Sequence, residues 1–279
     1  MTNNTSLPVP LTPAESAEKA IKFGSWFYAE HALKVMGRYF WSILAYSVGS
    51  PLAYLFAMGV GMASLINSNG RGDFGGVDYL TFLAPALVAS TALMSATGEY
   101  MFPVMGGFKW RRYFYGPHAS PLTPEQIAQG HIIAVTLRIL GPTAIYFLIV
   151  VLFGAAPGPW GWVSIFTATL CSLSFGLPLM AYVSTLEQDK GQFAIVQRFI
   201  VTPLFLFSGT FFPLTTLPWF LQWIGWISPL WHATELGRVL SYGYNEPGWL
   251  SVIHVVYMFA TAALGWFLTR RFFNRRMGK

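Results

Sequence analysis

The stretch FIVTPLFLFSGTFFPLTTLPWFLQWIGWISPLWHAT, residues 199–234, contains no Asp, Glu, Lys or Arg. Soluble domains carry a charge at about one residue in four, whereas the hydrocarbon core of a bilayer disfavours charged side chains. A helix needs about twenty apolar residues to cross roughly 30 Å of hydrocarbon, so this run is too long for one crossing. Four prolines divide it into shorter segments. The run therefore predicts a helical membrane protein and excludes a soluble fold.

The composition of the whole chain supports the same fold class. Hydrophobic residues make up 54% of the chain and charged residues 10%, and the mean hydropathy is +0.49. The net charge of +6 does not indicate a nucleic-acid partner, because the basic residues lie beside apolar segments rather than in one stripe. Cys171 is the one cysteine and lies in an apolar segment, which excludes an internal disulfide and a cysteine metal cluster.

Six apolar segments have the length of membrane spans. Residues 1–11 are polar and lack the basic stretch and apolar core of a cleaved signal peptide, so we expect the first span to be retained. The expected spans are residues 40–66, 79–101, 132–153, 162–184, 193–212 and 250–269.

Lysine and arginine residues are divided unevenly among the segments outside these spans. Thirteen lie in the amino-terminal segment, the second gap, the fourth gap and the tail, and only Arg71 and Arg238 lie in the other three gaps. The thirteen are Lys19, Lys22, Lys34, Arg38, Lys109, Arg111, Arg112, Lys190, Arg270, Arg271, Arg275, Arg276 and Lys279. Cytoplasmic loops carry the excess of positive charge, so both termini are expected in the cytoplasm.

The uncharged run 199–234 has room for two crossings or for one. A second crossing would move the arginine-rich tail to the outer side, against the charge rule, so we favour one span followed by a re-entrant or interfacial outer helix. Trp219, Trp223 and Trp226 follow the spacing i, i+4 and i+7, which places them on one helical face like an aromatic belt. Ordinary interfacial anchoring without a role in substrate binding is the alternative for these residues.

The amino-terminal segment is expected to form a helix before the first span. Thr12-Pro13-Ala14-Glu15 has the spacing of a capping box, with proline at the first helical position. Aromatic and basic residues alternate after it, which favours a helix lying in the headgroup layer over a solvated lead-in. The predicted fold is all-α, with this interfacial helix in segment 1–38 and one six-span domain, with its re-entrant outer helix between spans 5 and 6, in 39–279.

Motifs for catalysis or metal binding are absent from the sequence. The phosphate loop G-x-x-x-x-G-K-[ST] does not occur, so this chain is not expected to hold ATP by that route. His232 and Glu235 are separated by three residues, but a zinc site needs three or four ligands and H-E-x-x-H is missing. We therefore predict no metal and no catalytic residue, and interpret His232 and Glu235 as a structural hydrogen-bonding pair at the outer surface.

Three ionisable residues lie within expected spans, where they are costly and thus candidates for function. Glu99, Arg138 and Arg198 each lie near the inner ends of their spans. Glu99 is expected to neutralise Arg138, although the arginines have the alternative of extending separately to the headgroups. No carboxylate lies at mid-membrane, which argues against a carrier driven by protons or sodium.

The inner loop 102–129 is the most informative polar segment. Lys109, Trp110, Arg111, Arg112 and Tyr113 mix aromatic rings with cations, a pattern suited to docking on a soluble protein, with a solvated basic loop as the alternative. Thr123 and Gln126 have capping-box spacing around Pro124, so a helix is expected to begin here and continue into the third span.

Three stretches of this sequence resemble the type-2 ATP-binding-cassette exporter permeases, in the branch of nodulation-factor and daunorubicin exporter permeases. They are YLTFLAPAL at 79–87, SPLTPEQ at 120–126, and LFSGTFFP at 206–213 with SPLWHATE at 228–235. The last combines a span, a proline-rich outer turn and a short helix in the order of the family. The resemblance covers about residues 20–276.

The resemblance implies a bacterial, multi-pass subunit of the cell membrane that contacts membrane lipid. It implies pairing with a second copy or a paralogue, and binding of two cytoplasmic ATPase subunits that hold ATP and Mg²⁺. The loop after the second span, here Lys109 to Tyr113, would be the coupling element against the ATPase. This sequence departs from its relatives at Tyr113 to Tyr115 and His118, where a smaller, more acidic loop is common.

These observations predict the permease subunit of an exporter that moves an amphiphilic drug, a lipid or a lipid-linked glycan outward. A stand-alone channel or secondary carrier is the main alternative, and activity without an ATPase would favour it. A membrane-embedded enzyme is a third class, which requires a set of nucleophile or metal ligands that the sequence does not provide.

Overall fold

A computed structural model describes residues 12–37, 41, 45, 49, 52–68, 74 and 76–278. Regular structure in these residues is helical, without a β-strand, which confirms the predicted all-α fold class. Four helices in this part of the chain are long and apolar enough to cross a membrane. Residues 1–11, Arg38, Arg71 and Lys279, together with most of the first half of the expected span 40–66, lie outside the described residues.

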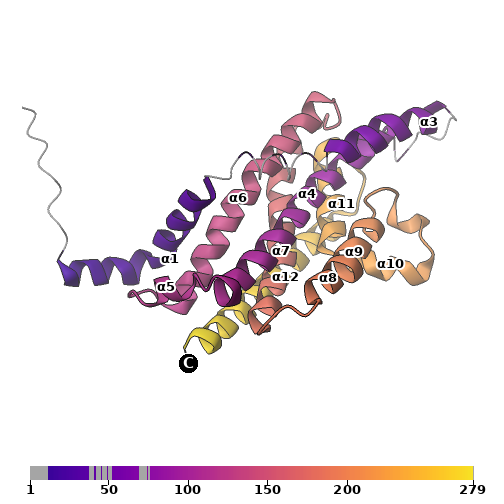
Figure 1. Ribbon diagram of the computed structural model, residues 1–279. Helices are drawn as coiled ribbons and strands as arrows, with labels where there is room; N and C mark the ends of the chain where they lie inside the picture. The colour runs from indigo at the N-terminus through magenta and orange to yellow at the C-terminus, as the bar shows by residue number, and fades with distance from the viewer. Residues whose placement is uncertain are drawn as a thin grey trace, which may run out of the picture.

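The four long helices form the centre of the molecule. They are α4 (Tyr79–Met105), α6 (Pro124–Leu152), α7 (Ser164–Thr185) and α12 (Gly248–Met277), and α7 packs against both α4 and α12 (Figure 1). Small residues allow these helices to approach closely. At Gly265 of α12, an added Cβ would lie 2.4 Å from Cδ of Pro178 on α7, so only glycine fits this crossing.

Polar side chains cap the amino-terminal ends of two of these helices, α4 and α6. Asp78 accepts a hydrogen bond from the backbone N–H of Thr81 at the start of α4. Before α6, Thr123 and Gln126 form the predicted capping box, with distances of 3.2 and 3.0 Å. The prediction that a helix begins here and continues into the third span is confirmed.

Helix α4 continues beyond the predicted end of the second span at residue 101. It passes into the π-helix η2 (Gly106–Trp110), and the short helix α5 (Tyr115–His118) follows. The predicted boundary was too early because the apolar packing continues past it. Phe108, which is buried, lies within this extension.

The region of the fifth expected span is one continuous helix, Gln192–Phe207, with a π-helical segment in its middle. It consists of α8 (Gln192–Ile195), the π-helix η4 (Val196–Val201) and α9 (Thr202–Phe207). The helix ends at Phe207, five residues before the predicted end of the span at residue 212, because Gly209 adopts a φ of 71°, which a helix cannot contain. The 3₁₀ turn η5 (Leu214–Thr216) follows α9, and a second 3₁₀ turn, η3 (Gly161–Val163), precedes α7.

Two further helices fill the connection to α12. Helix α10 (Trp219–Trp226) and helix α11 (Pro229–Tyr242) follow each other with a turn between them. Helix α11 packs against α4, α7 and α12, and most of its residues are buried. Helix α11 therefore belongs to the packed core of the bundle, whereas α10 buries only Gly225.

The amino-terminal helix α1 (Pro13–Gly37) starts with the predicted capping box: Glu15 accepts from the Thr12 N–H at 2.8 Å. It packs against α6, where the hydroxyl of Ser25 donates a hydrogen bond to Oε1 of Gln129 at 2.7 Å. The π-helix η1 (Leu55–Met62) and α3 (Ala63–Ser68) form the described part of the first expected span and contact α4.

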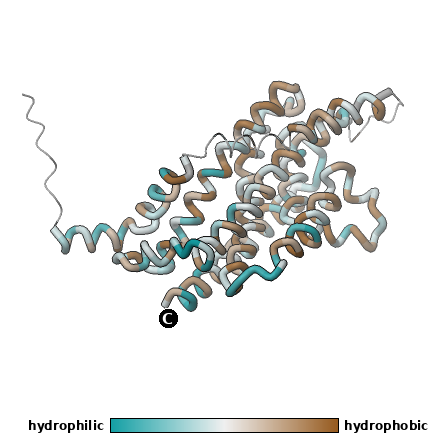
Figure 2. Tube along the Cα trace, in the orientation of Figure 1, coloured by the Kyte–Doolittle hydropathy of each residue, from teal (hydrophilic) through white to brown (hydrophobic). Residues whose placement is uncertain are grey.

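Hydrophobic residues cover most of the bundle along its length (Figure 2). Hydrophilic residues gather at the end where the carboxyl terminus lies, around the connection between α7 and α8 (Figure 2). Helix α4 and η2 together run from Tyr79 to Trp110 over 32 residues, so the two ends of the bundle are roughly 45 Å apart. We name them the Tyr79 end and the Trp110 end.

Candidate functional site

The inner loop at the Trp110 end has a rigid aromatic base. The ring of Phe108 is buried and lies 4.9 Å from that of Phe114 and 4.7 Å from that of Phe273 on α12. Trp110 is half exposed and its ring lies 6.0 Å from that of Phe193 on α8. The loop is therefore anchored from two other segments and presents part of an indole ring outward.

The other predicted residues of this loop face solvent. Lys109, Arg111, Arg112 and Tyr113 are exposed, and the Tyr113 hydroxyl donates to the carbonyl oxygen of Pro103. Arg112 has a φ of 55°, a left-handed conformation that is uncommon for a residue with a side chain. Backbone strain of this kind concentrates at functional sites, so it supports the choice of this loop.

Arg276, near the end of α12, joins this loop although it was assigned only to the tail. Its guanidinium lies 4.3 Å from the centroid of the Phe108 ring and donates to the carbonyl oxygen of Ser184 at 2.8 Å. Together with Lys109, Arg112 and Glu187 it lines a hollow of about 530 Å³. The Trp110 end is thus a basic, contoured surface built from three distant segments.

Glu99 and Arg138 form the ion pair that the sequence predicted. Nη1 of Arg138 on α6 lies 2.7 Å from Oε2 of Glu99 on α4, and both side chains are largely buried. The charges neutralise each other inside the bundle, so these residues do not extend separately to the headgroups. Arg198 differs: it lies exposed on η4 and has no ion-pair partner among the described residues.

The predicted pairing of His232 with Glu235 is wrong. Both residues lie on α11, but Nδ1 of His232 lies 2.6 Å from Nδ1 of His254 on α12. Oε1 of Glu235 instead accepts from Arg238 at 2.7 Å. The prediction failed because it considered only spacing within the segment, whereas the imidazole turns toward the neighbouring helix.

Arg238 is the residue that the sequence reasoning missed at this end. It was counted as a loop charge, yet only 1% of it is exposed. Its guanidinium donates to the carbonyl oxygen of Gly209 at 2.6 Å and lies 3.7 Å from the centroid of the Phe82 ring. The spacing i, i+3 from Glu235 is the signal that could have revealed the pair.

The predicted tryptophan face is present on α10. Trp219, Trp223 and Trp226 are 82, 52 and 53% exposed, and all three rings extend from the same short helix. Their exposure agrees with an amphipathic position at an interface. No group of three potential metal ligands occurs in the described part of the chain.

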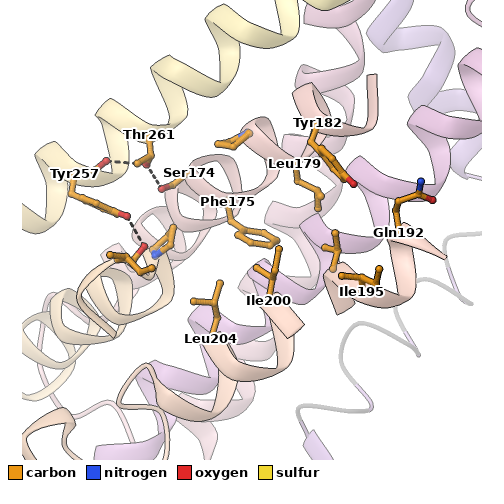
Figure 3. A pocket seen from close by; sticks show the side chains of 14 residues that line it. Ser174, Phe175, Leu179, Tyr182, Gln192, Ile195, Ile200, Leu204, Tyr257 and Thr261 are labelled. Atoms are coloured by element: carbon orange, nitrogen blue, oxygen red, sulfur yellow. Dashed lines mark hydrogen bonds between the residues drawn. The ribbon is translucent and has the colours of Figure 1, made fainter. Parts of the chain in front are cut away.

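A cavity of about 620 Å³ lies between α7, the continuous helix α8–η4–α9 and α12 (Figure 3). Phe175 and Leu179 of α7 face Ile195, Ile200 and Leu204 across it (Figure 3). Its few polar groups are largely engaged: the Ser174 and Thr261 hydroxyls share a 2.5 Å hydrogen bond. Sequence patterns cannot reveal such a cavity, because it arises where three helices fail to meet.

Comparison with known proteins identifies the family. The family described as ABC-2 type transporter matches residues 31–242. Nodulation protein J of Sinorhizobium fredii is 27% identical over 232 residues, covering 83% of this chain and 85% of the relative. Nodulation protein J of Rhizobium meliloti is 28% identical over 236 residues, covering 83% and 85%. Inner membrane transport permease YadH of Escherichia coli is 25% identical over 207 residues, covering 72% and 78%.

The family match extends over most of the chain, and the relatives in the nodulation branch align over most of their own length. The resemblance noted from the three sequence stretches is therefore confirmed. The chain belongs to the ABC-2 type transporter family and is a helical membrane permease of that family.

Proposed function

We propose that this chain is the membrane-spanning subunit of an ATP-driven exporter. It pairs with a second copy or a paralogue, and two cytoplasmic ATPase subunits bind ATP and Mg²⁺ and supply the energy. Hydrolysis changes the packing of the two bundles and moves an amphiphilic drug, a lipid or a lipid-linked glycan outward. The chain itself holds no cofactor and catalyses no reaction.

The shape of the inner loop is the observation that carries this proposal. A half-exposed indole and three exposed cations are held on a base of buried rings. Large aromatic side chains and arginines supply most of the binding energy at protein interfaces, provided that they are held in place. A force applied at Trp110 would reach the bundle directly, because η2 continues α4 without a break.

The proposed topology has six spans with both termini in the cytoplasm of a bacterial cell. Four spans correspond to the long apolar helices, and the shorter apolar helices over residues 52–66 and 192–207 represent the first and fifth. Residues 1–38 form the cytoplasmic interfacial segment, and residues 39–279 form the permease domain in contact with membrane lipid. The printed name of the relative YadH, an inner membrane transport permease, supports this location.

The proposed re-entrant element comprises α10 and α11. Helix α10 has eight residues and a length of about 12 Å, which is too short to cross. Helix α11 has fourteen residues and buries Glu235 and Arg238 in the bundle. In this arrangement α8–α9 crosses the membrane once, and α10 with α11 enters and leaves on the outer side. Helix α12 then crosses back, so its basic end lies on the same side as the inner loop.

The cavity between α7 and α9 supports an amphiphilic cargo. Its walls are almost entirely aliphatic or aromatic, and Tyr182 and Gln192 provide polar groups at one end (Figure 3). An apolar chain would gain free energy here by the same burial that packs a protein core. We assign the cavity to the apolar portion of the cargo.

Reconstitution with and without an ABC ATPase that co-purifies with this chain tests the proposal. We expect the chain alone to bind no ATP and to move no cargo, and the complex to move an amphiphilic dye at the expense of ATP. Micromolar ATP binding by the isolated chain would contradict the assignment of roles. Transport by the chain alone would instead establish the channel or secondary carrier.

A further inference from the structure

Three titratable side chains form an unbroken line at the Tyr79 end of the bundle. Nε2 of His232 lies 3.0 Å from the carbonyl oxygen of Trp226, and its Nδ1 lies 2.6 Å from Nδ1 of His254. On the far side of His254, Nε2 lies 3.3 Å from Oε1 of Glu246 and has no hydrogen-bond partner among the described residues. Four segments meet in this line: α10, α11, α12 and the loop between α11 and α12.

The carbonyl at one end of the line determines where the protons lie. A carbonyl oxygen only accepts, so Nε2 of His232 carries a hydrogen. One further hydrogen must lie between the two Nδ1 atoms, because two bare nitrogens 2.6 Å apart would repel each other. Nε2 of His254 is buried in an ion-pair contact of 3.3 Å with the Glu246 carboxylate and has no other partner among the described residues, so a third hydrogen is needed at this contact to satisfy both atoms.

The complete line therefore holds three protons, whereas two neutral imidazoles and a carboxylate hold two. We propose that His232, His254 and Glu246 form a proton-binding site that closes the loop 243–247 onto α12 when it holds this third proton. The ligand of the site is the proton itself. Its uptake leaves the line without net charge, while its loss places two lone pairs against each other at the contact between His254 and Glu246.

Burial favours this proton on the Glu246 carboxyl rather than on the imidazoles, because desolvation lowers the pKa of His232 to about 4. The Glu246 side chain is 4% exposed, and desolvation raises the pKa of its carboxyl above the ordinary value. The hydroxyl of Ser251 donates to the same Oε1 atom at 3.1 Å and acts in the opposite direction. The carboxyl of Glu235 adds to the rise, because a second negative charge nearby disfavours ionisation.

Other titratable groups around the line do not provide the proton. Glu235 and Arg238 of α11 pair with each other. Tyr257 of α12 stacks on His232 at 4.1 Å between ring centroids and donates to the carbonyl oxygen of Ile227, and Tyr79 of α4 donates to that of Phe211. Tyr242 and Tyr244 flank the loop, and desolvation raises the pKa of the Tyr242 phenol above its ordinary value.

The pH dependence of loop closure follows from counting protons in the open and closed forms. Above about pH 7.5, open histidines and an open glutamate hold two protons, so closing takes up one and becomes tenfold less favourable per pH unit. Below about pH 6, the open histidine pair keeps its shared Nδ1 proton and carries a hydrogen on each Nε2, so it already holds three protons and closing neither takes up nor releases one. Closure is therefore strongest and independent of pH below about pH 6, and it weakens above about pH 7.5.

Replacing Glu246 with Gln separates this mechanism from an ordinary hydrogen bond. The amide N–H of Gln can donate to Nε2 of a neutral His254, so the line closes with two protons and no uptake above pH 7.5. We expect Glu246→Gln to stay closed at alkaline pH and to lose the alkaline decline. Glu246→Asp keeps a carboxylate and should keep the decline.

Hydrogen–deuterium exchange of the full chain in lipid nanodiscs measures this directly. The amide of Tyr244 donates to the Arg238 carbonyl, and the amide of Leu250 donates to the Pro247 carbonyl. The protection factors of these two amides, measured between pH 5.5 and 9 and corrected for intrinsic exchange rates, report how often the loop opens. We expect a plateau below about pH 6 and a tenfold fall per pH unit above about 7.5. Glu187→Gln, a carboxylate removed at the opposite end, should leave this profile unchanged.

A flat wild-type profile from pH 7.5 to 9 would overturn the proposal. So would the same alkaline decline in Glu246→Gln as in the wild type, because the decline would then arise elsewhere. Protection of α7 amides in the same spectra shows whether each variant is folded. If Glu246→Gln misfolds, the wild-type and Glu246→Asp profiles still test the proposal. Protection must fall tenfold per pH unit above about pH 7.5 in both proteins, and a flat profile in either would overturn it.

Discussion

Nη1 of Arg238 lies 2.7 Å from Oε1 of Glu235, and this ion pair is enclosed in the Tyr79 end of the bundle. The same guanidinium donates to the Gly209 carbonyl and stacks on Phe82, so it joins α11 to α4 and to the end of α9. A charge in such a place is stable only when each of its donors is engaged. The pair explains how a short polar helix can be buried among membrane helices.

Replacing Arg238 with Met should therefore be strongly destabilising. It leaves the Glu235 carboxylate buried without its partner, and loss of one member of a buried pair costs about 3–5 kcal/mol. The double variant Glu235→Leu with Arg238→Met should be more stable than Arg238→Met alone, because it removes the orphaned charge. Thermal unfolding in detergent checks both, and equal melting temperatures for the single and double variants would contradict this account.

Replacing Trp110 with Ala should weaken binding of the ATPase without affecting folding. Truncation of a large interface anchor costs about 2 kcal/mol or more, which is roughly a thirtyfold loss of affinity. The assembled complex and the ATPase activity stimulated by cargo are measured in proteoliposomes. Trp219→Ala is the matched control, because Trp219 is more exposed and lies on α10 at the other end.

Charge reversal at Arg111 and Arg112 refines the same prediction. If the arginines meet acidic groups of the ATPase, reversal should lower assembly as strongly as Trp110→Ala. If they face lipid headgroups, the effect should be modest. Normal assembly and transport in both the tryptophan and the arginine variants would exclude the loop as the coupling element and favour α1.

The ion pair between Glu99 and Arg138 should show strong coupling in a double-mutant cycle. Glu99→Gln and Arg138→Gln each leave a largely buried charge unpaired, so the two effects should overlap by about 1–3 kcal/mol. The exposed pair of Glu30 and Lys34 is the comparison within this chain, and its coupling should stay below about 1 kcal/mol. Additive effects at residues 99 and 138 would show that the pair does not act as a unit.

Filling the cavity should lower transport of apolar cargo. Leu179→Trp places a larger ring in the space between α7 and α9, whereas Phe166→Trp changes an exposed ring of the same helix outside the cavity. Initial transport rates of an amphiphilic dye in proteoliposomes with the ATPase should fall for Leu179→Trp alone. Equal rates in both variants would remove the cavity from the transport path.

Labelling of introduced cysteines decides the topology. On a Cys171→Ser background, we expect a membrane-impermeant maleimide to reach Trp219→Cys from outside intact cells and to reach Arg275→Cys only after permeabilisation. The reason is that the basic end of α12 follows the positive-inside rule. External labelling at residue 275 would mean that α10 and α11 contain a further crossing.

The sequence was sufficient for properties that depend on neighbours along the chain. The capping boxes at Thr12 and Thr123 were predictable because a helix start depends on side chains three residues apart. The long spans were predictable because bilayer thickness imposes a length and a composition. The partner of Arg138 was predictable because both it and Glu99 had to lie at similar depth on consecutive spans.

Tertiary structure alone decided which side chains meet across helices. His232 and His254 are 22 residues apart, and Arg238 and Phe82 are 156 apart, so no local period relates them. Their contacts depend on the crossing of α11 with α12 and α4, which packing of small residues such as Gly237 and Gly265 permits. The sequence therefore determined a bundle of membrane helices with a basic loop between residues 102 and 129. Only the packing of those helices turned an apparent loop charge, Arg238, into a buried link and placed His232 in line with His254 and Glu246.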